Sequence, residues 1–254
     1  KEIKKVINKG ELTPKAIIPV DLFGYLADYS SLEVIAERYN LTIIEDAAQS
    51  FGASYEGKKS CSFGKVSATS FYPAKPLGCY GDGGAIFTDD EEMHKLLVSI
   101  RVHGQGSDKY NNQRIGINGR LDTLQAVILI EKLKLLDEEI DLRNKVAAKY
   151  NELIMSVETP KISEGNISAW AQYSVLAKSS QHRNELMNKL KENGIPSVIY
   201  YPVPLHLQDA FKYLNYSKGD HKYSEDVASR IFSLPMHPYL KNEEIERIAY
   251  ILNS

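Results

Sequence analysis

Two short segments hold residue types that could carry out covalent chemistry on an amine. Asp46 follows an apolar run and opens the segment Asp-Ala-Ala-Gln-Ser, and Lys75 lies within Ser-Phe-Tyr-Pro-Ala-Lys-Pro-Leu-Gly, which spans residues 70–78. A lysine amine can form a Schiff base with an aldehyde, and a carboxylate can keep a pyridine nitrogen protonated. Pyridoxal 5'-phosphate needs both groups from a protein, so the two segments indicate a site for this cofactor.

Each of these residues also has an ordinary interpretation. A lysine is most often a solvated surface residue, and an aspartate after a strand often caps a helix or a turn. A hydroxyl such as that of Ser70, near the glycine-rich turn at residues 81–84, is a neutral contact for a phosphate. That turn runs into an apolar segment typical of a strand, whereas Walker-type and dinucleotide loops open a helix. We therefore interpret it as turn geometry beside Lys75.

The elements around Asp46 follow the pattern of a strand-helix-strand unit. Residues 15–20 and 41–45 are short apolar runs, and apolar residues recur at helical spacing between them. A crossover of this length favours parallel strands, and ligand-binding residues collect at the carboxyl ends of such strands. The pattern therefore places Asp46 where the binding site of an α/β protein is expected.

The rest of the chain divides into further strands and helices. Strands at residues 66–72 and 84–88 place Lys75 on the loop between them. An almost continuous helical pattern covers residues 121–155, with a bend or break near 137–143, and should connect two domains. The other predicted elements are strands at 169–177 and 197–200 and helices at 2–9, 89–102, 181–193, 221–232 and 242–252.

The composition argues against nucleic acids, metals and membranes as binding partners. The chain has 254 residues, with 31 basic and 33 acidic residues and a net charge of -2, which provides no electrostatic reason to bind nucleic acid. Cys61 and Cys79 cannot build a disulfide framework, and their spacing does not suit zinc, so no metal is expected. No apolar stretch approaches the roughly 20 residues that span a bilayer. We expect a cytoplasmic protein without a membrane or nucleic-acid partner.

The segments quoted above, together with Gly-Ile-Asn-Gly-Arg-Leu-Asp at residues 116–122, resemble the DegT/DnrJ/EryC1/StrS family of nucleotide-sugar aminotransferases. The resemblance runs from about residue 15 to the last helices. It implies an α/β protein with the fold type I architecture of pyridoxal phosphate-dependent transferases, similar to aspartate aminotransferase. Residues 1–137 would form a large domain with a mainly parallel sheet, and residues 138–254 a long connecting helix and a smaller α/β domain. The large domain would be partial, because relatives carry an upstream cofactor-binding segment.

The resemblance assigns cofactor roles to four residues. Lys75 would hold the cofactor and shuttle a proton between substrate and cofactor carbons, while Asp46 would pair with the pyridine nitrogen. Gln49 corresponds to a position near the ring and its phenolic oxygen. Ser70 corresponds to the serine that binds the phosphate.

Other matches concern substrate and subunit contacts. Asn118 would reach the phosphate of a neighbouring subunit, and Arg120 the acidic substrate, which implies a homodimer with shared active sites. Asn-Gly alone would be read as a turn before a helix. Segments 100–104 and 200–206 also match family segments, and the second lies near the sugar nucleotide; the residues concerned are Arg101, His103, Tyr200, Tyr201 and His206. Many relatives have a histidine where Tyr200 stands.

The resemblance implies transfer of an amino group from glutamate to a keto sugar nucleotide. Residues 75–84 are most similar to members that act at C3 of a UDP-linked 2-acetamido hexuronic acid for surface polysaccharide synthesis, including lipopolysaccharide. One alternative is a 4-aminotransferase on a UDP-4-keto-6-deoxy sugar. Another is a non-catalytic fragment that only dimerises and binds sugar nucleotides. Related dehydratases replace the Schiff-base lysine with histidine, so Lys75 argues against that activity.

Overall fold

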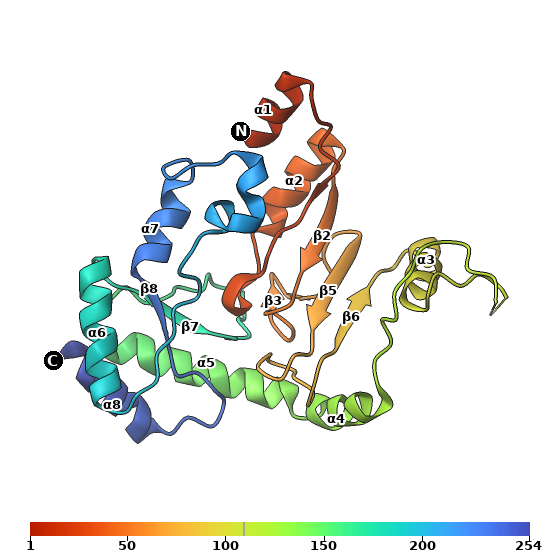
Figure 1. The fold of residues 1–254 in the computed structure, drawn as a ribbon. Coiled ribbons are helices and arrows are strands. Elements are labelled where there is room, and N and C mark those ends of the chain that lie inside the picture. The colour runs from red at the N-terminus through yellow and green to blue at the C-terminus, as the bar shows by residue number, and fades with distance from the viewer. Residues whose placement is uncertain (109) are drawn as a thin grey trace. The chain divides into compact units, whose positions relative to one another are not determined.

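The computed structural model describes residues 1–108 and 110–254 and divides them into two compact units (Figure 1). The first unit contains residues 1–138 and 164–169, and the second contains residues 139–163 and 170–254. Residues 164–169 join the first unit through a pair of 2.9 Å backbone hydrogen bonds between Ile167 and Ser54. No helix in the described ranges has the length and apolar character needed to cross a membrane.

The first unit is built on a four-stranded sheet with strand order β1-β2-β5-β6. These strands are β1 (Ala16–Ile17), β2 (Thr42–Asp46), β5 (Val66–Ser70) and β6 (Gly84–Phe87). β1, β2 and β5 are mutually parallel and β6 is antiparallel to β5, so the prediction of a mainly parallel sheet is confirmed.

Helices flank this sheet in sequence. α1 (Glu2–Lys9) precedes β1, and α2 (Tyr29–Tyr39) is the crossover between β1 and β2. The carboxylate of Asp28 caps α2 by accepting a hydrogen bond from Ser31 N. After β6, Asp90 caps α3 (Glu91–Arg101) in the same way.

The two faces of the sheet differ in their exposure to solvent. Side chains alternate along a strand, so Glu45 faces the buried side and Asp46 the partly exposed side. Asp46 is in register with Ala68, and Ser70 lies two residues further along β5. Asp46 and Ser70 therefore share the open face of the sheet, near the carboxyl ends of neighbouring strands.

A short hairpin in the first unit was not predicted. β3 (Ser54–Tyr55) pairs antiparallel with β4 (Lys58–Lys59). The connecting residues, Glu56 and Gly57, have φ values of 49° and 79°. Both central positions of this two-residue turn thus need positive φ, which suits the glycine but is less common for a glutamate.

The helical region that follows is two helices, α4 (Thr123–Leu133) and α5 (Leu136–Leu153). The predicted break is present, but it lies at Lys134 and Leu135, just before residues 137–143. There, Lys134 N bonds to Glu131 O at 3.3 Å and Leu135 N to Lys132 O at 3.1 Å. These bonds span three residues instead of four, so the helix tightens and ends before the charged stretch.

The second unit packs helices around a two-stranded sheet. β7 (Tyr173–Leu176) pairs antiparallel with β8 (Ile231–Leu234). Its buried core includes Tyr150, Tyr173, Leu190, Phe232 and Ile245. The remaining elements are the 3₁₀ turns Leu205–Leu207 and Asp209–Leu214 and the helices α6 (Ser180–Glu192), α7 (Lys222–Arg230) and α8 (Asn242–Asn253).

Two predictions for the second unit need correction. The helix predicted for residues 221–232 is present as α7 but ends at Arg230, because residues 231–234 form β8 and pair with β7. The strand predicted at residues 197–200 is reduced to one bridge between Val198 and Ser233. Pro196 and Pro202 flank that segment and lack the N–H groups that a longer ladder would need.

Candidate active site

Asp46 ends β2 with one carboxylate oxygen engaged and the other available. Oδ1 accepts a hydrogen bond of 3.1 Å from Ala48 N. The backbone is fixed on both sides, since Asp46 N donates to Pro19 O at 2.9 Å and Asp46 O accepts from Asp21 N at 3.1 Å. Within the described part of the chain, Oδ2 accepts no hydrogen bond. The half-buried carboxylate can therefore accept one more charged N–H donor.

Lys75 lies on the loop that joins β5 to β6, as the strand pattern predicted. Three backbone hydrogen bonds of 2.8 to 2.9 Å fold this loop, from Lys75 to Tyr72, from Cys79 to Phe71 and from Phe71 to Gly83. The Lys75 side chain is half-buried, and its Nζ has no hydrogen-bond or ion-pair partner among residues 1–108 and 110–254. An amine without a carboxylate partner is free to react with an aldehyde.

The loop closes on itself at Gly78. A Cβ atom at this position would lie 2.5 Å from Pro73 O and 2.8 Å from Tyr72 O, closer than any side chain tolerates. Ser70, at the start of the loop, accepts a hydrogen bond of 3.2 Å on Oγ from Tyr72 N, which leaves its hydroxyl proton to donate.

Helix α4 supports the outer side of the Lys75 loop. Lys132 Nζ donates to Gly78 O, and Gln125 Oε1 accepts a 2.8 Å hydrogen bond from Tyr80 N. Sequence reasoning missed both supporting residues. A lysine and a glutamine on a helix carry no local signal of the loop that they hold.

Gln49 lies in the turn after Asp46 and is 7% exposed. Its Oε1 accepts a hydrogen bond of 2.6 Å from the backbone N–H of Phe23. The structure therefore places Gln49 between the turn after β2 and the turn that follows β1. The contact between Gln49 and a cofactor ring remains a prediction.

Two buried carboxyl groups lie behind these turns. Asp21 and Glu45 are 0% exposed. Burial raises the pKa of both groups, that of Glu45 to about 7, despite backbone hydrogen bonds that lower it. Burial also raises the pKa of the Cys61 thiol to about 12, with the nearby Glu45 contributing. Cys61 is therefore a neutral thiol at physiological pH.

The predicted segments around Arg101 and Asn118 lie side by side. His103 N donates to Ile117 O and Gly119 N to Arg101 O, both at 2.9 Å. Asn118 Oδ1 accepts a 3.1 Å hydrogen bond from Arg120 Nε, and both side chains are exposed. Across the described residues, no hydrogen bond or ion pair links this segment to Asp46 or Lys75.

The other predicted substrate residues belong to the second unit. The rings of Tyr200 and Tyr201 are 5.5 Å apart. His206 Nε2 lies 3.1 Å from Glu225 Oε1. Although burial raises the pKa of Glu225, hydrogen bonds from the backbone of Gly219 and from His206 outweigh it, and the pKa is lowered. Glu225 is thus an anion that orients the His206 ring.

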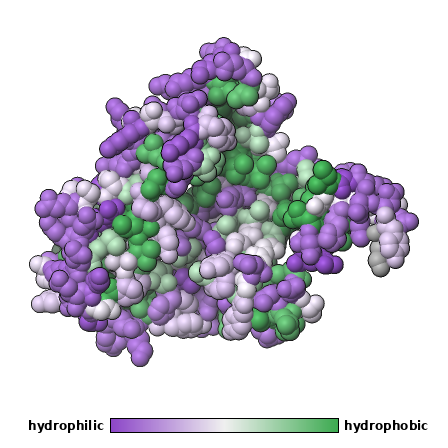
Figure 2. Space-filling view, viewed as in Figure 1, coloured by the Kyte–Doolittle hydropathy of each residue, from purple (hydrophilic) through white to green (hydrophobic). Residues whose placement is uncertain are grey.

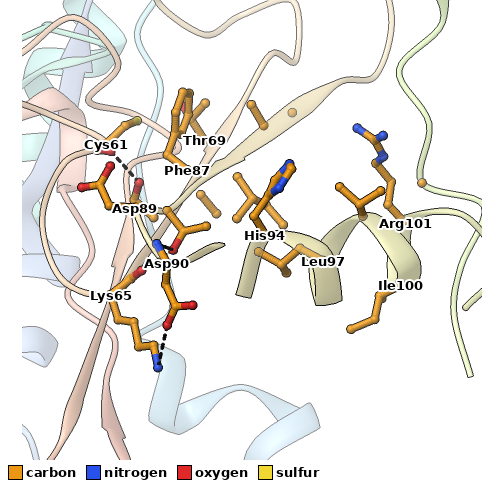
Figure 3. A pocket seen from close by; sticks show the side chains of 18 of the residues that line it. Cys61, Lys65, Thr69, Phe87, Asp89, Asp90, His94, Leu97, Ile100 and Arg101 are labelled. Carbon is orange, nitrogen blue, oxygen red and sulfur yellow. Dashed lines mark hydrogen bonds and ion pairs between the residues drawn. The ribbon is translucent and has the colours of Figure 1, made fainter. Parts of the chain in front are cut away.

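A cavity of about 1150 Å³ runs along β6 and α3 of the first unit (Figure 3). Figure 3 shows Lys65, Asp90, His94 and Arg101 around it, with Lys65 Nζ 3.2 Å from Asp90 Oδ2. Asp46, Gln49 and Lys75 are not among its lining residues. The cavity and the candidate active site are therefore separate features of the unit.

Comparison with known proteins finds sugar aminotransferases of similar sequence and fold. The sequence pattern of the DegT/DnrJ/EryC1/StrS aminotransferase family matches residues 1–253. A UDP-2-acetamido-2-deoxy-3-oxo-D-glucuronate aminotransferase of Pseudomonas aeruginosa is 47% identical over 247 residues, which cover 96% of this chain and 67% of that protein. A pleiotropic regulatory protein of Geobacillus stearothermophilus is 44% identical, covering 92% of this chain and 64% of that protein.

Solved structures agree with the fold. A DegT DnrJ EryC1 StrS aminotransferase from Brucella abortus has a TM-score of 0.94 and 52% identity, covering 99% of this chain and 67% of that one. DesV of S. venezuelae, solved with a ketimine intermediate, has a TM-score of 0.89 and 34% identity, covering 97% of this chain and 67% of that one. The predicted fold type I architecture is confirmed. The chain spans about two thirds of the length of these relatives.

Proposed function

The chain belongs to the DegT/DnrJ/EryC1/StrS aminotransferase family, and we propose that it transfers an amino group from glutamate to a keto sugar nucleotide. Enzymes of this family depend on pyridoxal 5'-phosphate. When bound, the cofactor supplies an electron sink for the carbon that loses or gains a proton.

The donor and acceptor groups of the site fit this cofactor. Asp46 Oδ2 is available to accept an N–H, and the Ser70 hydroxyl is available to donate to a phosphate. Both side chains lie on the open face of the sheet, and the Lys75 loop follows Ser70 directly. The half-buried amine of Lys75, which has no partner in the described residues and lies on the loop that follows Ser70, is the observation that carries the proposal, because Schiff-base formation needs an uncommitted amine.

Each residue has a distinct task in the proposed reaction. The Asp46 carboxylate holds a proton on the pyridine nitrogen by accepting a charged hydrogen bond from it. Lys75 would hold the aldehyde group of the cofactor through its amine, and its Nζ would move the proton at the reacting carbon. Gln49 lines the ring, and Ser70 donates to the phosphate.

We further propose C3 of a UDP-linked 2-acetamido hexuronic acid as the acceptor, in surface polysaccharide synthesis. The activity in the name of the Pseudomonas aeruginosa relative, an aminotransferase of UDP-2-acetamido-2-deoxy-3-oxo-D-glucuronate, supports this choice. Arg120, Tyr200, Tyr201 and His206 are the proposed substrate contacts. The alternatives are a 4-aminotransferase on a UDP-4-keto-6-deoxy sugar and a non-catalytic fragment of such an enzyme. The proposed location is the cytoplasm, in keeping with the free state of Cys61 and Cys79.

A homodimer with shared active sites is part of the proposal. Four apolar side chains of α4 lie on the surface, with exposures of 52 to 78%: Leu124, Val127, Ile130 and Leu133. Figure 2 shows hydrophobic surface in the region of this helix. An apolar stripe of this kind favours burial against a second chain. The exposed Asn118 would then be available to the site of that chain.

Reductive trapping tests the proposal. The protein is mixed with pyridoxal 5'-phosphate, its absorbance is recorded before and after borohydride, and the labelled peptide is identified by mass spectrometry. We expect a cofactor band and a label on Lys75, and neither with Lys75→Ala. Glutamate and the 3-keto and 4-keto sugar nucleotides are then assayed in turn. Absence of any Lys75-dependent label would favour the non-catalytic alternative.

A further inference from the structure

Asp21 and Glu45 are two fully buried carboxyl groups for which the proposed reaction has no use. Asp21 follows Val20, which bridges to Asp46 at the end of β2. Glu45 immediately precedes Asp46, so its side chain occupies the opposite, buried face of the strand. The two groups therefore lie directly behind the turns that present Asp46 and Gln49.

Asp21 accepts three hydrogen bonds. Its Oδ1 accepts from Ala27 N at 3.1 Å and from the Tyr29 hydroxyl at 2.9 Å. Its Oδ2 accepts from Ser50 Oγ at 2.8 Å. This donor set stabilises a negative charge on Asp21.

Glu45 accepts two backbone hydrogen bonds and faces Asp21. Cys61 N donates to its Oε1 at 2.7 Å, and Phe63 N donates to its Oε2 at 2.9 Å. The Glu45 and Asp21 carboxyl groups also lie within hydrogen-bonding reach of each other. Two buried carboxyl groups this close repel each other when both are ionised, so the pair keeps one proton to a higher pH than an isolated carboxyl group would.

Among the described residues, no cation compensates the charge of the pair. The titratable groups beside the pair are the Tyr29 hydroxyl, which donates to Asp21, and the Cys61 thiol, and burial keeps both neutral. Lys58 Nζ packs over the ring of Phe63, 4.6 Å from its centroid, and makes no ion pair with either acid in the described residues. Because Asp21 has more donors than Glu45, the proton belongs on Glu45, which donates to the Asp21 carboxylate.

Hydrogen bonds of the same residues connect two turns. Asp21 N donates to Asp46 O at 3.1 Å, and Ser50 Oγ donates to the Asp21 carboxylate. Phe23 N donates to Gln49 Oε1. The turn at residues 20–24 is thus tied to the turn at residues 46–50 through the Asp21 carboxylate and its neighbours.

We propose that Asp21 and Glu45 share one proton and, through it, act as positioning residues that hold Asp46 and Gln49 in place for the cofactor. The cofactor part of this inference rests on the proposed function; the shared proton does not. Loss of the proton places two anions against each other, and the repulsion loosens the two turns. The pair therefore makes the geometry around Asp46 dependent on pH.

Carboxyl titration of the cofactor-free protein tests the shared proton. Carbon-13 NMR with labelled glutamate and aspartate follows each side-chain carboxyl through the pH range. We expect one glutamate signal to titrate near neutral pH, and to be absent in Glu45→Gln. Titration of every glutamate and aspartate carboxyl below about pH 5 would overturn the proposal, because no carboxyl proton would remain at neutral pH.

Amide hydrogen exchange tests the positioning role without using activity. After correction for intrinsic rates, protection of the Asp21, Phe23 and Asp46 amides should fall about tenfold as the pH rises by roughly one unit above neutrality. Glu45→Gln keeps a neutral donor toward Asp21 and should hold its protection constant. Asp137→Asn, at an exposed carboxylate of the same unit, should behave like the wild type. Equal pH dependence in wild type and Glu45→Gln would overturn the proposal.

Ser50→Ala is a milder variant in case Glu45→Gln does not fold. It removes one donor from the Asp21 carboxylate but keeps both carboxyl groups, so the near-neutral titration should persist in this variant, with part of the proton transferred from Glu45 to Asp21. Loss of the near-neutral titration in a folded Ser50→Ala protein would contradict the shared proton. The dissociation constant of pyridoxal 5'-phosphate, relative to that of Glu45→Gln, should rise about tenfold over the same pH interval. A constant ratio would overturn the positioning role, whereas absence of binding at every pH would overturn the proposed function and leave the shared proton intact.

Discussion

The backbone N–H of Phe23 donates a 2.6 Å hydrogen bond to Oε1 of Gln49, which lies 26 residues further along the chain. Phe23 has a φ of 62°, an uncommon value for a side chain of its size. The bond joins the turn after β1 to the turn after β2. These two turns together support Asp46. A substitution that moves one turn should therefore also move the other.

Replacement of Gln49 by leucine should destabilise the first unit. The substitution removes the acceptor of the Phe23 N–H, and an unsatisfied buried amide costs about 1–3 kcal/mol. Denaturant unfolding measures the loss. Gln181→Leu, at an exposed glutamine of α6, is the control and should change stability by less than about 0.5 kcal/mol. Equal effects of the two substitutions would contradict a structural role for this hydrogen bond.

Gly78→Ala should impair the Lys75 loop. The new Cβ would lie 2.5 Å from Pro73 O, a backbone atom, so the loop has to move. We expect at least about a tenfold loss of borohydride-fixed cofactor on Lys75, from a misplacement of the amine by about 1 Å. Gly81→Ala is a matched control on the same loop, because its Cβ meets only the flexible end of Gln125 at 3.1 Å. A loss as large with Gly81→Ala would argue against the steric explanation.

Asp46→Asn should weaken cofactor binding while sparing the fold. The amide oxygen can still accept from Ala48 N, but the charge that holds the pyridine nitrogen protonated is lost. A hydrogen bond to a charged group contributes about 1.5–3 kcal/mol, so affinity should fall by roughly 10- to 100-fold in a spectrophotometric titration. Asp82→Asn, at an exposed aspartate of the Lys75 loop, should bind normally. Unchanged affinity of Asp46→Asn would remove Asp46 from the cofactor site.

The stability of the first unit should decrease as the pH rises toward neutrality. The folded protein keeps a proton on Glu45 up to about pH 7, whereas the ordinary pKa of this group is 4.5, so the unfolded chain releases the proton earlier. The stabilisation is complete below pH 4.5 and is lost as the pH rises through about 7. Its upper limit is roughly 3 kcal/mol. Urea unfolding of the wild type and of Glu45→Gln is measured at a series of pH values. The difference between their free energies of unfolding isolates this contribution, and a difference that stays constant with pH would refute it.

Mixing two inactive variants tests the shared site. If Asn118 serves the partner's site, a heterodimer of Lys75→Ala with Asn118→Ala has one site with both residues intact. Random pairing then restores about a quarter of the wild-type activity. Mixed-tag purification verifies that heterodimers have formed. Heterodimers without activity would place Asn118 and Lys75 in the same chain's site.

Local pattern was sufficient to predict the elements around Asp46 and Lys75. The apolar runs and the glycine-rich turn predicted β2, β5 and β6, and the structure has all three with Asp46 at a strand end and Lys75 on the following loop. These elements could be predicted because their signals, apolar periodicity and turn residues, lie within the elements themselves.

The errors arose where a distant segment determines the backbone. Residues 231–234 form a strand because β7, more than 50 residues earlier, provides their hydrogen-bond partners. The apolar character of this segment suits a buried helix end equally well. The strand predicted at residues 197–200, between Pro196 and Pro202, does not form. This segment makes a single bridge to a distant residue, from Val198 to Ser233.

The sequence by itself determined the chemistry available to this protein: a lysine and a carboxylate at strand ends, in the pattern of a sugar aminotransferase family. Tertiary structure alone decided how these groups are held. Gln125 and Lys132 reach the Lys75 loop from α4, and Asp21 meets Glu45 from the turn that follows β1. Burial and hydrogen bonding depend on which distant segments contact each other in the fold. The spacing of residues within one segment carries no information about those contacts.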